Sequence, residues 1–263
     1  MICDTHMHFY DQRFPAAPEA VLRPPDATVA DYRVAQQRMG LERVVVVQPT
    51  TYGLDNRCQL EAMATLGSVA RGVVVLDAAS ATTDSVAELT ALGVRGARFH
   101  MLPGGAVGWD QLEPVARVIA DYGWHVQLQL DGHELAARRE QLLDLPCGLV
   151  VDHVGRFMPP VEPDSAPFRA LLDLVDAGAY VKLSAPYESA LDPNHRYELV
   201  SRCVAALVQR APDRLLWASN WPHPGQADPP SVDDLGRLRD LWLPEPALRQ
   251  QILVDNPAAL YDF

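Results

Sequence analysis

Short runs of apolar residues recur along this chain, and a stretch with helical spacing follows each of them. The run 44–47 is four consecutive valines, and the runs 73–75 and 149–151 are just as continuous. Strands that are apolar without alternation are typical of parallel sheets that are buried on both faces. Eight strands are expected, at 1–5, 43–48, 70–76, 95–99, 124–130, 149–152, 180–183 and 215–218.

Helices are expected between these strands, at 28–39, 85–92, 112–122, 134–143, 167–176 and 198–210. Thr28 and Asp31 have the spacing of a capping box at the start of the first helix, and Gly40 suits its end. Further glycines stand where a helix should stop before the next strand: Gly93, Gly123 and Gly178.

Repeated strand–helix units predict a parallel sheet, and a count of eight favours a (β/α)8 barrel that forms a single domain over 1–263, possibly distorted. The alternative is an open, doubly wound sheet, which would need a glycine-rich turn after the first strand. Residues 4–8 there read Asp-Thr-His-Met-His, which cannot cradle a phosphate. The proline-rich segments 14–25 and 159–167 are expected to be long loops over one face of the barrel.

Composition excludes some partners. The formal net charge of −12 argues against nucleic acid, because binding phosphates needs a basic surface. The N-terminal residues do not read as a signal peptide, and no segment has the length and apolar content of a membrane span. The four cysteines show no Cys-x-x-Cys spacing, so we expect reduced thiols and a cytoplasmic protein.

The first strand ends in two histidines. Asp4, His6 and His8 alternate along it, so strand geometry predicts that all three point to the same side. Two converging imidazoles can hold a divalent metal, polarise a carbonyl or move a proton. The alternative is that they only cap the strand and bond to loops.

Polar residues also follow most of the other strands, at the end where barrel enzymes assemble their active sites. A single polar strand end is unremarkable, but the same pattern on most of the strands predicts an active site. The candidates from these positions and the loops that follow them are Gln48, Thr50, Arg98, Gln129, His153, Lys182, Tyr187, Asn220 and His223.

Three motifs carry a resemblance to the amidohydrolase superfamily. They are Asp-x-His-x-His at 4–8, Asp-His-x-Gly at 152–155 and Trp-x-x-Asn-Trp-Pro-His at 217–223. Their order along the chain resembles the amidohydrolase 2 branch, in particular its 2-pyrone-4,6-dicarboxylate lactonases and galactarolactone isomerases. The segment 101–107 resembles the isomerases more loosely. The resemblance covers essentially the whole chain and implies a barrel enzyme that acts on lactones.

Two positions depart from the metal-dependent members of that superfamily. The resemblance implies a histidine on strand five and an aspartate on strand eight, where this chain has Gln129 and Asn220. A neutral amide is a poor ligand for a divalent cation and is no base near neutral pH. With His6, His8 and His153 but no obvious carboxylate, we expect no tightly held metal, although a weakly bound divalent ion at His6 and His8 stays open.

The residues divide into two expected roles. Arg98 is the best candidate to hold a substrate carboxylate, because a guanidinium fork matches a carboxylate; the alternative is an ion pair inside the barrel. For Lys182 a structural role is equally open. The expected catalytic residues are His6, His8, His153 and Asn220, the last as a hydrogen-bond donor to an oxyanion. The expected substrate contacts are Gln48, Thr50, Arg98, Gln129, Lys182, Tyr187 and His223.

The leading prediction is a lactonase that hydrolyses a carboxylated lactone. The first alternative is a metal-independent isomerase of sugar-acid lactones, in which a hydroxyl of the substrate attacks the ring carbonyl. The second is a metal-dependent hydrolase or decarboxylase. A barrel that only binds a small acid is the non-enzymatic alternative, and the sequence leaves the oligomeric state open.

Overall fold

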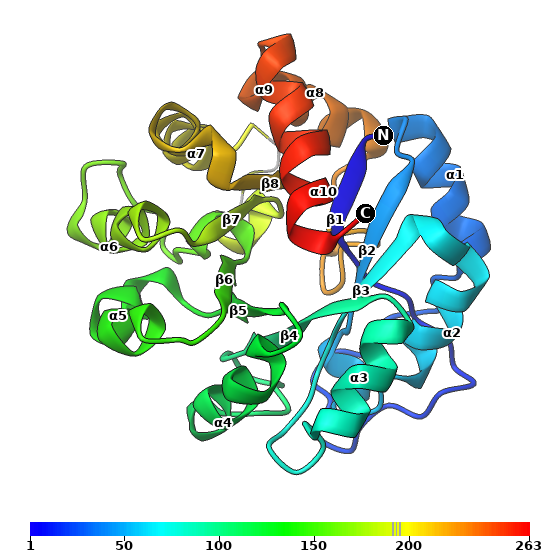
Figure 1. The fold of residues 1–263 in the computed structure, drawn as a ribbon. Coiled ribbons are helices and arrows are strands. Elements are labelled where there is room, and N and C mark those ends of the chain that lie inside the picture. The colour runs from blue at the N-terminus through cyan, green and yellow to red at the C-terminus, as the bar shows by residue number, and fades with distance from the viewer. Residues whose placement is uncertain (191, 193, 195) are drawn as a thin grey trace.

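The computed structural model describes residues 1–190, 192, 194 and 196–263. Its centre is one sheet of eight parallel strands, which lie in the same order as in the sequence (Figure 1). The eight strands that the sequence predicts are confirmed, with shifts at their ends. They are β1 (Cys3–Met7), β2 (Arg43–Val47), β3 (Ala70–Val74), β4 (Val94–His100), β5 (His125–Gln129), β6 (Gly148–Val151), β7 (Tyr180–Leu183) and β8 (Leu215–Trp217).

The barrel closes between β8 and β1 without a regular ladder. The hydroxyl of Thr5 donates to the carbonyl oxygen of Trp217 at 2.9 Å, and the amide of Asn220 donates to the carbonyl oxygen of His6, also at 2.9 Å. The amide of Ser219 donates to the carboxylate of Asp4 at 2.9 Å. The predicted (β/α)8 barrel is therefore confirmed, with an irregular seam beside the two histidines of the first motif.

Helices surround the sheet. The longer ones are α1 (Val29–Met39), α2 (Arg57–Leu66), α3 (Thr83–Ala91), α4 (Trp109–Ala120), α5 (Leu135–Leu143), α6 (Ala166–Asp176), α7 (Glu198–Arg210), α8 (Val232–Trp242), α9 (Pro246–Gln250) and α10 (Asn256–Tyr261). Short turns of helix are η1 (Thr50–Tyr52), η2 (Gly67–Val69), η3 (Gly132–Glu134), η4 (His153–Gly155), η5 (Pro186–Glu188), η6 (Pro212–Arg214) and the π-helical η7 (Gln251–Asp255). No helix in the described part of the chain is both long and apolar enough to cross a membrane.

The six predicted helices are present, and α1 begins and ends as expected. Thr28 and Asp31 form the capping box, and Gly40 ends the helix in the left-handed conformation with φ 67°. The sequence analysis missed α2 and the helices after β8. Asn56 stands at the N-cap position of α2, but its side chain makes no capping hydrogen bond there.

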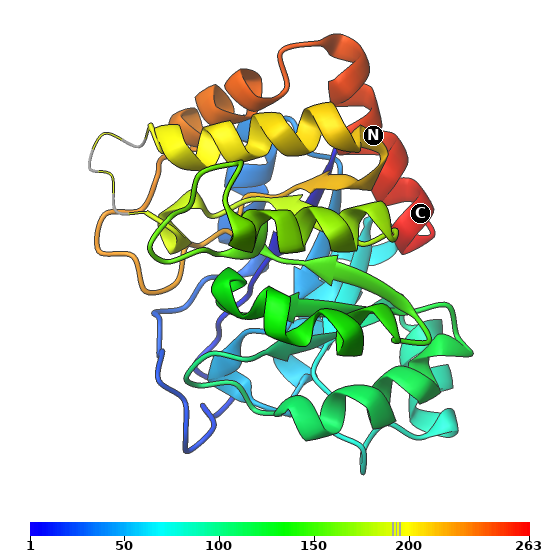
Figure 2. The same cartoon turned by 90° about the vertical axis from the view of Figure 1, so that its left-hand side faces the viewer.

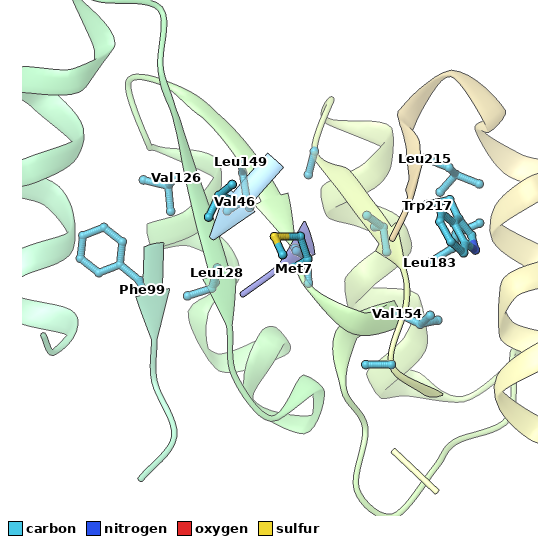
Figure 3. Close-up of a cluster of buried hydrophobic side chains, with 14 of the residues drawn as sticks. Met7, Val46, Phe99, Val126, Leu128, Leu149, Val154, Leu183, Leu215 and Trp217 are labelled. Atoms are coloured by element: carbon cyan, nitrogen blue, oxygen red, sulfur yellow. The ribbon is translucent and has the colours of Figure 1, made fainter. Parts of the chain in front are cut away.

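Two apolar layers hold the barrel together. The larger lies between the strands and the helices, and Figure 3 shows part of it, including Met7, Val46 and Trp217. The smaller fills the inside of the barrel and includes Cys3, Val45, Val47, Val73, Val150, Leu216 and Tyr261. Tyr261 comes from α10, which lies beside β1 in Figure 1, so the end of the chain helps to fill the barrel from its N-terminal end.

A bulge in β1 corrects one prediction. Asp4 pairs with Val44, but Met7 pairs with Val46, so β1 has one residue more than β2 over this stretch. Asp4 therefore points to the helix layer, where the hydroxyl of Tyr32 on α1 donates to it at 3.0 Å. The prediction that Asp4 faces the same side as His6 and His8 is wrong, because strict alternation fails at a bulge.

The loops that follow the strands gather at one end of the barrel. In Figure 2 the blue loop after β1 and the orange loop after β8 lie on the left, away from both chain termini. The proline-rich segments 14–25 and 159–167 form no strand, and of the second only its last two residues begin α6. The first segment is fixed over the barrel mouth where the hydroxyl of Thr51 donates to the carbonyl oxygen of Leu22 at 2.9 Å.

Candidate active site

A cavity opens among the loops at the carboxyl ends of the strands. Its volume is about 50 Å³, or about 370 Å³ when the space open to solvent is counted. The residues that line it are His8, Tyr10, Leu22, Pro49, Thr50, Arg98, His100, Gln129, His153, Glu188, Asn220 and Pro224. This is the end of the barrel where the sequence predicts the active site.

Three histidines gather at the cavity: His8 and His153 line it, and His6 lies behind them. The Nε2 atoms of His6 and His8 are 3.2 Å apart, and the ring centroids of His6 and His153 are 4.8 Å apart. His8 is oriented by the carbonyl oxygen of Val47, which accepts from its Nδ1 at 2.8 Å. The Nδ1 atom of His153 lies 2.8 Å from the hydroxyl of Ser184. The prediction that His6 and His8 converge is therefore confirmed, and His153 lies beside them.

A buried charged network lies beneath the histidines. Asp152 Oδ1 is 3.3 Å from His6 Nδ1 and 3.7 Å from Lys182 Nζ. Lys182 also donates to the carbonyl oxygen of Thr5 at 2.8 Å and to Gln127 Oε1 at 2.6 Å. The expectation that the site has no carboxylate is wrong, because Asp152, the residue before His153, points inward toward His6.

Lys182 is thus part of the barrel interior. It is fully buried and does not line the cavity, so the structure supports the structural alternative over a substrate contact. Burial lowers the pKa of Lys182 to about 8, and the carboxylate of Asp152 works against that shift. Its Nζ lies 3.5 Å from Nδ1 of His6, so its charge acts on the histidine cluster from behind the cavity wall.

The histidines of the site are neutral near neutral pH. Burial lowers the pKa of His8 to about 3, and the guanidinium of Arg98 adds to the shift. Burial also places the pKa values of His6 and His153 well below the ordinary value. Neutral imidazoles can accept a proton or donate a hydrogen bond, which suits acid–base chemistry on an uncharged carbonyl.

The site fits a metal ion only in part. In the described residues, His6, Asp152 and His153 offer ligand atoms that all lie within 4.8 Å of one another. If Asp152 accepts from His6 Nδ1, the lone pairs of His6 Nε2 and His8 Nε2 face the same point, as in a metal site. However, the ammonium of Lys182 is 3.7 Å from Asp152, and Gln129 Oε1 already accepts from Arg98. The nitrogen ligands fit a divalent cation, but the surrounding charge does not.

Arg98 is a buried cation on the cavity wall. It is 4% exposed, and it donates at 2.7 Å to both the carbonyl oxygen of Gln48 and Gln129 Oε1. Its Nε is buried without a partner, and no carboxylate in the described part of the chain forms an ion pair with it. Burial also lowers its pKa from the ordinary value. The structure therefore does not support the alternative in which Arg98 forms an ion pair inside the barrel.

Asn220 lines the cavity and has one buried acceptor atom without a partner. Its Nδ2 donates to the hydroxyl of Tyr187 at 2.8 Å, and that hydroxyl lies 2.9 Å from Nδ1 of His223. Asn220 Oδ1 is buried without a partner. Tyr187 takes one of the two N–H groups of Nδ2, so the prediction that Asn220 donates to an oxyanion stays a prediction.

The backbone at these strand ends is held in a strained conformation. His153, Asn220 and His223 have φ of 55°, 57° and 64°, and Ala185 after β7 has φ 44°. Left-handed backbone at such residues costs about 1–3 kcal/mol each and persists where the surrounding structure fixes it. Here the amide of His223 donates to the carbonyl oxygen of Asn220 at 2.8 Å, and the amide of Asn220 to that of His6. The loops are therefore set before a substrate arrives.

The predicted substrate contacts divide into two groups. Thr50, Arg98 and Gln129 line the cavity, as do the predicted catalytic residues His8, His153 and Asn220. The others lie behind the wall. Gln48 Nε2 donates to the carbonyl oxygen of Asp55 at 2.8 Å, so Gln48 fixes a loop instead of meeting a substrate. The residues behind the wall are His6, Gln48, Lys182, Tyr187 and His223.

The sequence analysis missed part of the wall. Tyr10 and Leu22 come from the loop after β1, and Pro49 and Pro224 from other loops, where no periodic pattern points inward. His100 has a usable signal, because it is the last residue of β4, two residues after Arg98. Its Nδ1 is 3.2 Å from Gln129 Oε1, and burial lowers its pKa to about 3. Glu188 follows Tyr187 and was recognisable only as an acid near the site.

The chain folds as a (β/α)8 barrel, and histidines from β1 and from the end of β6 gather at the carboxyl ends of the strands. This combination of fold and site is typical of a class of barrel hydrolases and their relatives. The chain belongs to the amidohydrolase family, whose model matches residues 3–263.

Individual relatives narrow the class. The chain is 36% identical to the D-galactarolactone isomerase of Agrobacterium fabrum (strain C58 / ATCC 33970), over 98% of this chain and 90% of that protein. It is 33% identical to the 2-pyrone-4,6-dicarboxylate hydrolase of Comamonas testosteroni, over 98% and 89%. A crystal structure of an Agrobacterium tumefaciens protein matches with a TM-score of 0.93 and 34% identity, over 100% of this chain and 96% of that one. The predicted family and the enzyme class are confirmed.

Proposed function

We propose that this protein catalyses attack on the carbonyl carbon of a carboxylated lactone. The observation that carries the proposal is Arg98, a buried guanidinium on the cavity wall that has no carboxylate partner in the described chain. A buried cation without a counter-ion is costly unless a ligand supplies the negative charge. The relatives named as acting on carboxylated lactones support the same class of substrate.

The geometry suggests how the residues divide the work. With the carboxylate of the substrate on Arg98, the ring carbonyl lies over His8 and His153. Because Nδ1 of His8 donates to Val47, its Nε2 is an acceptor that can take the proton of the nucleophile. If the hydroxyl of Ser184 donates to Nδ1 of His153, Nε2–H of His153 is free to donate to the forming oxyanion. When the tetrahedral intermediate collapses, the ring carbon–oxygen bond breaks and the ring oxygen takes the proton back from His8.

The nucleophile can be water or a hydroxyl of the substrate. A lactonase, which the sequence places first, needs a base for water, and here that base is the weakly basic His8. Isomerisation uses a hydroxyl that is already part of the substrate and gains from proximity. Two observations favour it over hydrolysis. Asn220 Oδ1 is an open acceptor that can hold such a hydroxyl, and the isomerase relative is 36% identical over nearly the whole chain.

We also propose that no tightly held metal takes part, because Lys182 and Arg98 place two cations at the edges of the histidine cluster. A cytoplasmic location remains part of the proposal, and the four free cysteines support it.

The test is proton NMR of the purified enzyme with a panel of aldaric acid lactones, muconolactones and pyrone carboxylic acids. We expect turnover of at least one carboxylated lactone that survives dialysis against a chelator. We expect His8→Gln to lower kcat by about 100-fold, the size of effect that a general base contributes.

The matched control is His133→Gln, since His133 lies outside the cavity on η3 and should keep wild-type activity. Failure of every lactone in the panel would contradict the proposed function. Complete loss of activity on chelation, restored by one divalent ion, would contradict only the metal-independent part.

A further inference from the structure

The long loop after β1 crosses the mouth of the cavity. It comprises residues 11–26, which we call the strap, and it is part of the blue loop on the left of Figure 2. The strap leaves and rejoins the barrel at one point, because Tyr10 and Ala27 form an antiparallel bridge with N···O distances of 3.1 and 2.8 Å. A surface loop of this length with its ends together is an Ω-loop, a type that is frequently functional. The strap contributes Leu22 to the lining of the cavity.

The base of the strap is held firmly. The amide of Asp11 donates to the hydroxyl of Tyr52 at 2.8 Å. Nη2 of Arg13 lies 2.6 Å from Oε1 of Glu61 on α2. Together with the bridge, these contacts tie the start of the strap to the barrel wall. Any movement of the strap therefore belongs to its tip, at residues 15–25.

One residue holds the tip. In the described part of the chain, two hydrogen bonds and no ion pair join residues 15–25 to the rest of the barrel, and both bonds are made by Thr51 on η1. The carbonyl oxygen of Thr51 accepts from the amide of Ala17 at 2.8 Å. Its hydroxyl donates to the carbonyl oxygen of Leu22 at 2.9 Å. Thr51 therefore acts as a latch on the tip.

The tip otherwise rests on glycines. It approaches Gly53, Gly104 and Gly225, which stand in the loops after β2, β4 and β8. A Cβ atom on Gly104 would lie 3.3 Å from Cγ2 of Val21, and one on Gly225 would lie 3.4 Å from Cδ2 of Leu22. At these three positions no side chain interlocks with the tip, and Val21 and Leu22 are 66% and 37% exposed. A segment with so few buried contacts opens locally at low free-energy cost.

The space beneath the tip is small. The cavity has a volume of about 50 Å³ when the space open to solvent is left out. Pockets that bind small organic molecules usually measure about 300–1,000 Å³, and one water takes about 30 Å³. A ring that carries a carboxylate therefore needs more room than this arrangement gives. The strap is the part of the wall with the weakest attachment, so it is the part that gives way.

We propose that the strap is a lid, whose tip lifts from Thr51 to admit a small molecule and then closes over it with Leu22 above the bound ring. The inference goes beyond the proposed function, because the lid controls entry to the cavity whatever reaction follows. Closure also has a chemical use, since it separates the histidines of the cavity from bulk water.

The experiment measures how fast diethyl pyrocarbonate, which acylates neutral imidazoles, modifies individual histidines at neutral pH, with peptide mass spectrometry as the readout. His8 and His153 line the cavity and are 3% and 2% exposed, so they should react only while the lid is open. His133 lies outside the cavity with its side chain 34% exposed and serves as the internal reference. Thr51→Val should raise the rates at His8 and His153 about fivefold relative to His133, the effect of losing one hydrogen bond.

The matched control is Thr51→Ser, which keeps the hydroxyl and should keep the wild-type rates. A folded Thr51→Val protein with wild-type rates at His8 and His153 would show that Thr51 is no latch and would overturn the proposal. A second measurement needs no variant. In wild-type hydrogen exchange, the amide of Ala17 should exchange at least about 100-fold faster than the amides of β2, since it opens locally. Exchange of Ala17 at the rate of β2 would contradict the lid, and neither measurement depends on turnover of a lactone.

Discussion

Arg98→Met is expected to lower kcat/KM for a carboxylated lactone by about a thousandfold. Losing one partner of a buried, hydrogen-bonded charge pair costs about 2–5 kcal/mol. The substrate carboxylate would lose Arg98, the only guanidinium that lines the cavity in the described part of the chain. The measurement is steady-state kinetics on the substrate that the NMR panel identifies, with thermal unfolding recorded beside it. Unfolding matters because the carbonyl oxygen of Gln48 and Gln129 Oε1 both accept from Arg98.

Two further variants separate charge from fold. Arg98→Lys keeps the charge but loses the planar fork, so we expect an intermediate loss and normal folding. Arg117→Met, on the outer surface of α4, should leave the kinetics unchanged. A folded Arg98→Met enzyme with wild-type kcat/KM would mean that Arg98 does not bind the substrate.

The folded protein should also lose stability steeply in mild acid. In the described part of the chain, burial lowers the pKa values of six histidines: His6, His8, His100, His125, His153 and His223. Below their ordinary pKa of about 6.5 the unfolded chain binds protons that the folded chain does not. Stability is therefore complete above that pH and falls as the pH drops.

The size of the loss follows from linkage. About one pH unit below the ordinary histidine pKa, each such histidine costs on the order of 1 kcal/mol, so the six together cost several kcal/mol. Since whole domains are stable by only about 5–15 kcal/mol, acid unfolding should occur between about pH 4 and pH 6. The measurement is the free energy of unfolding by urea at a series of pH values.

A variant outside the active site tests whether the buried histidines cause this loss of stability in acid. His125 lies in the barrel interior against Tyr261, with both ring nitrogens unpaired, and it takes no part in the proposed reaction. His125→Gln should reduce the slope of stability against pH by about one proton, because one titrating group is gone. A free energy of unfolding that stays flat from pH 7 to about pH 4.5 would show that these histidines titrate normally when folded.

Much of the fold could be predicted because the local sequence signals for single strands and helices agree with the fold of the whole chain. The valines of β2 and the capping box at Thr28 each specify one element without help from the rest of the chain. The helices after β8 could not be predicted as easily. One of them, η7, is a π-helix. Another, α10, is held by Tyr261, which packs into the barrel against Cys3, so it depends on a contact between the two ends of the chain.

The site could be predicted as a set of residues but not as an arrangement. Strand ends meet at one edge, so the grouping of His8, His153 and Arg98 follows from the topology. The inward direction of Asp152 follows from alternation after Val150, since its backbone is still extended. The outward direction of Asp4 does not follow from the topology, because a bulge sets it. The direction of the Asn220 amide depends on Tyr187, a partner that no spacing rule supplies.

The most direct test of the account is turnover of a hydroxylated lactone in oxygen-18 water, followed by proton NMR and mass spectrometry. If a hydroxyl of the substrate attacks the carbonyl, as Asn220 Oδ1 suggests, the product is a lactone of different ring size that carries no label. Label in the carboxylate of an opened acid as the first product would contradict isomerisation and identify a lactonase that uses His8 as the base for water.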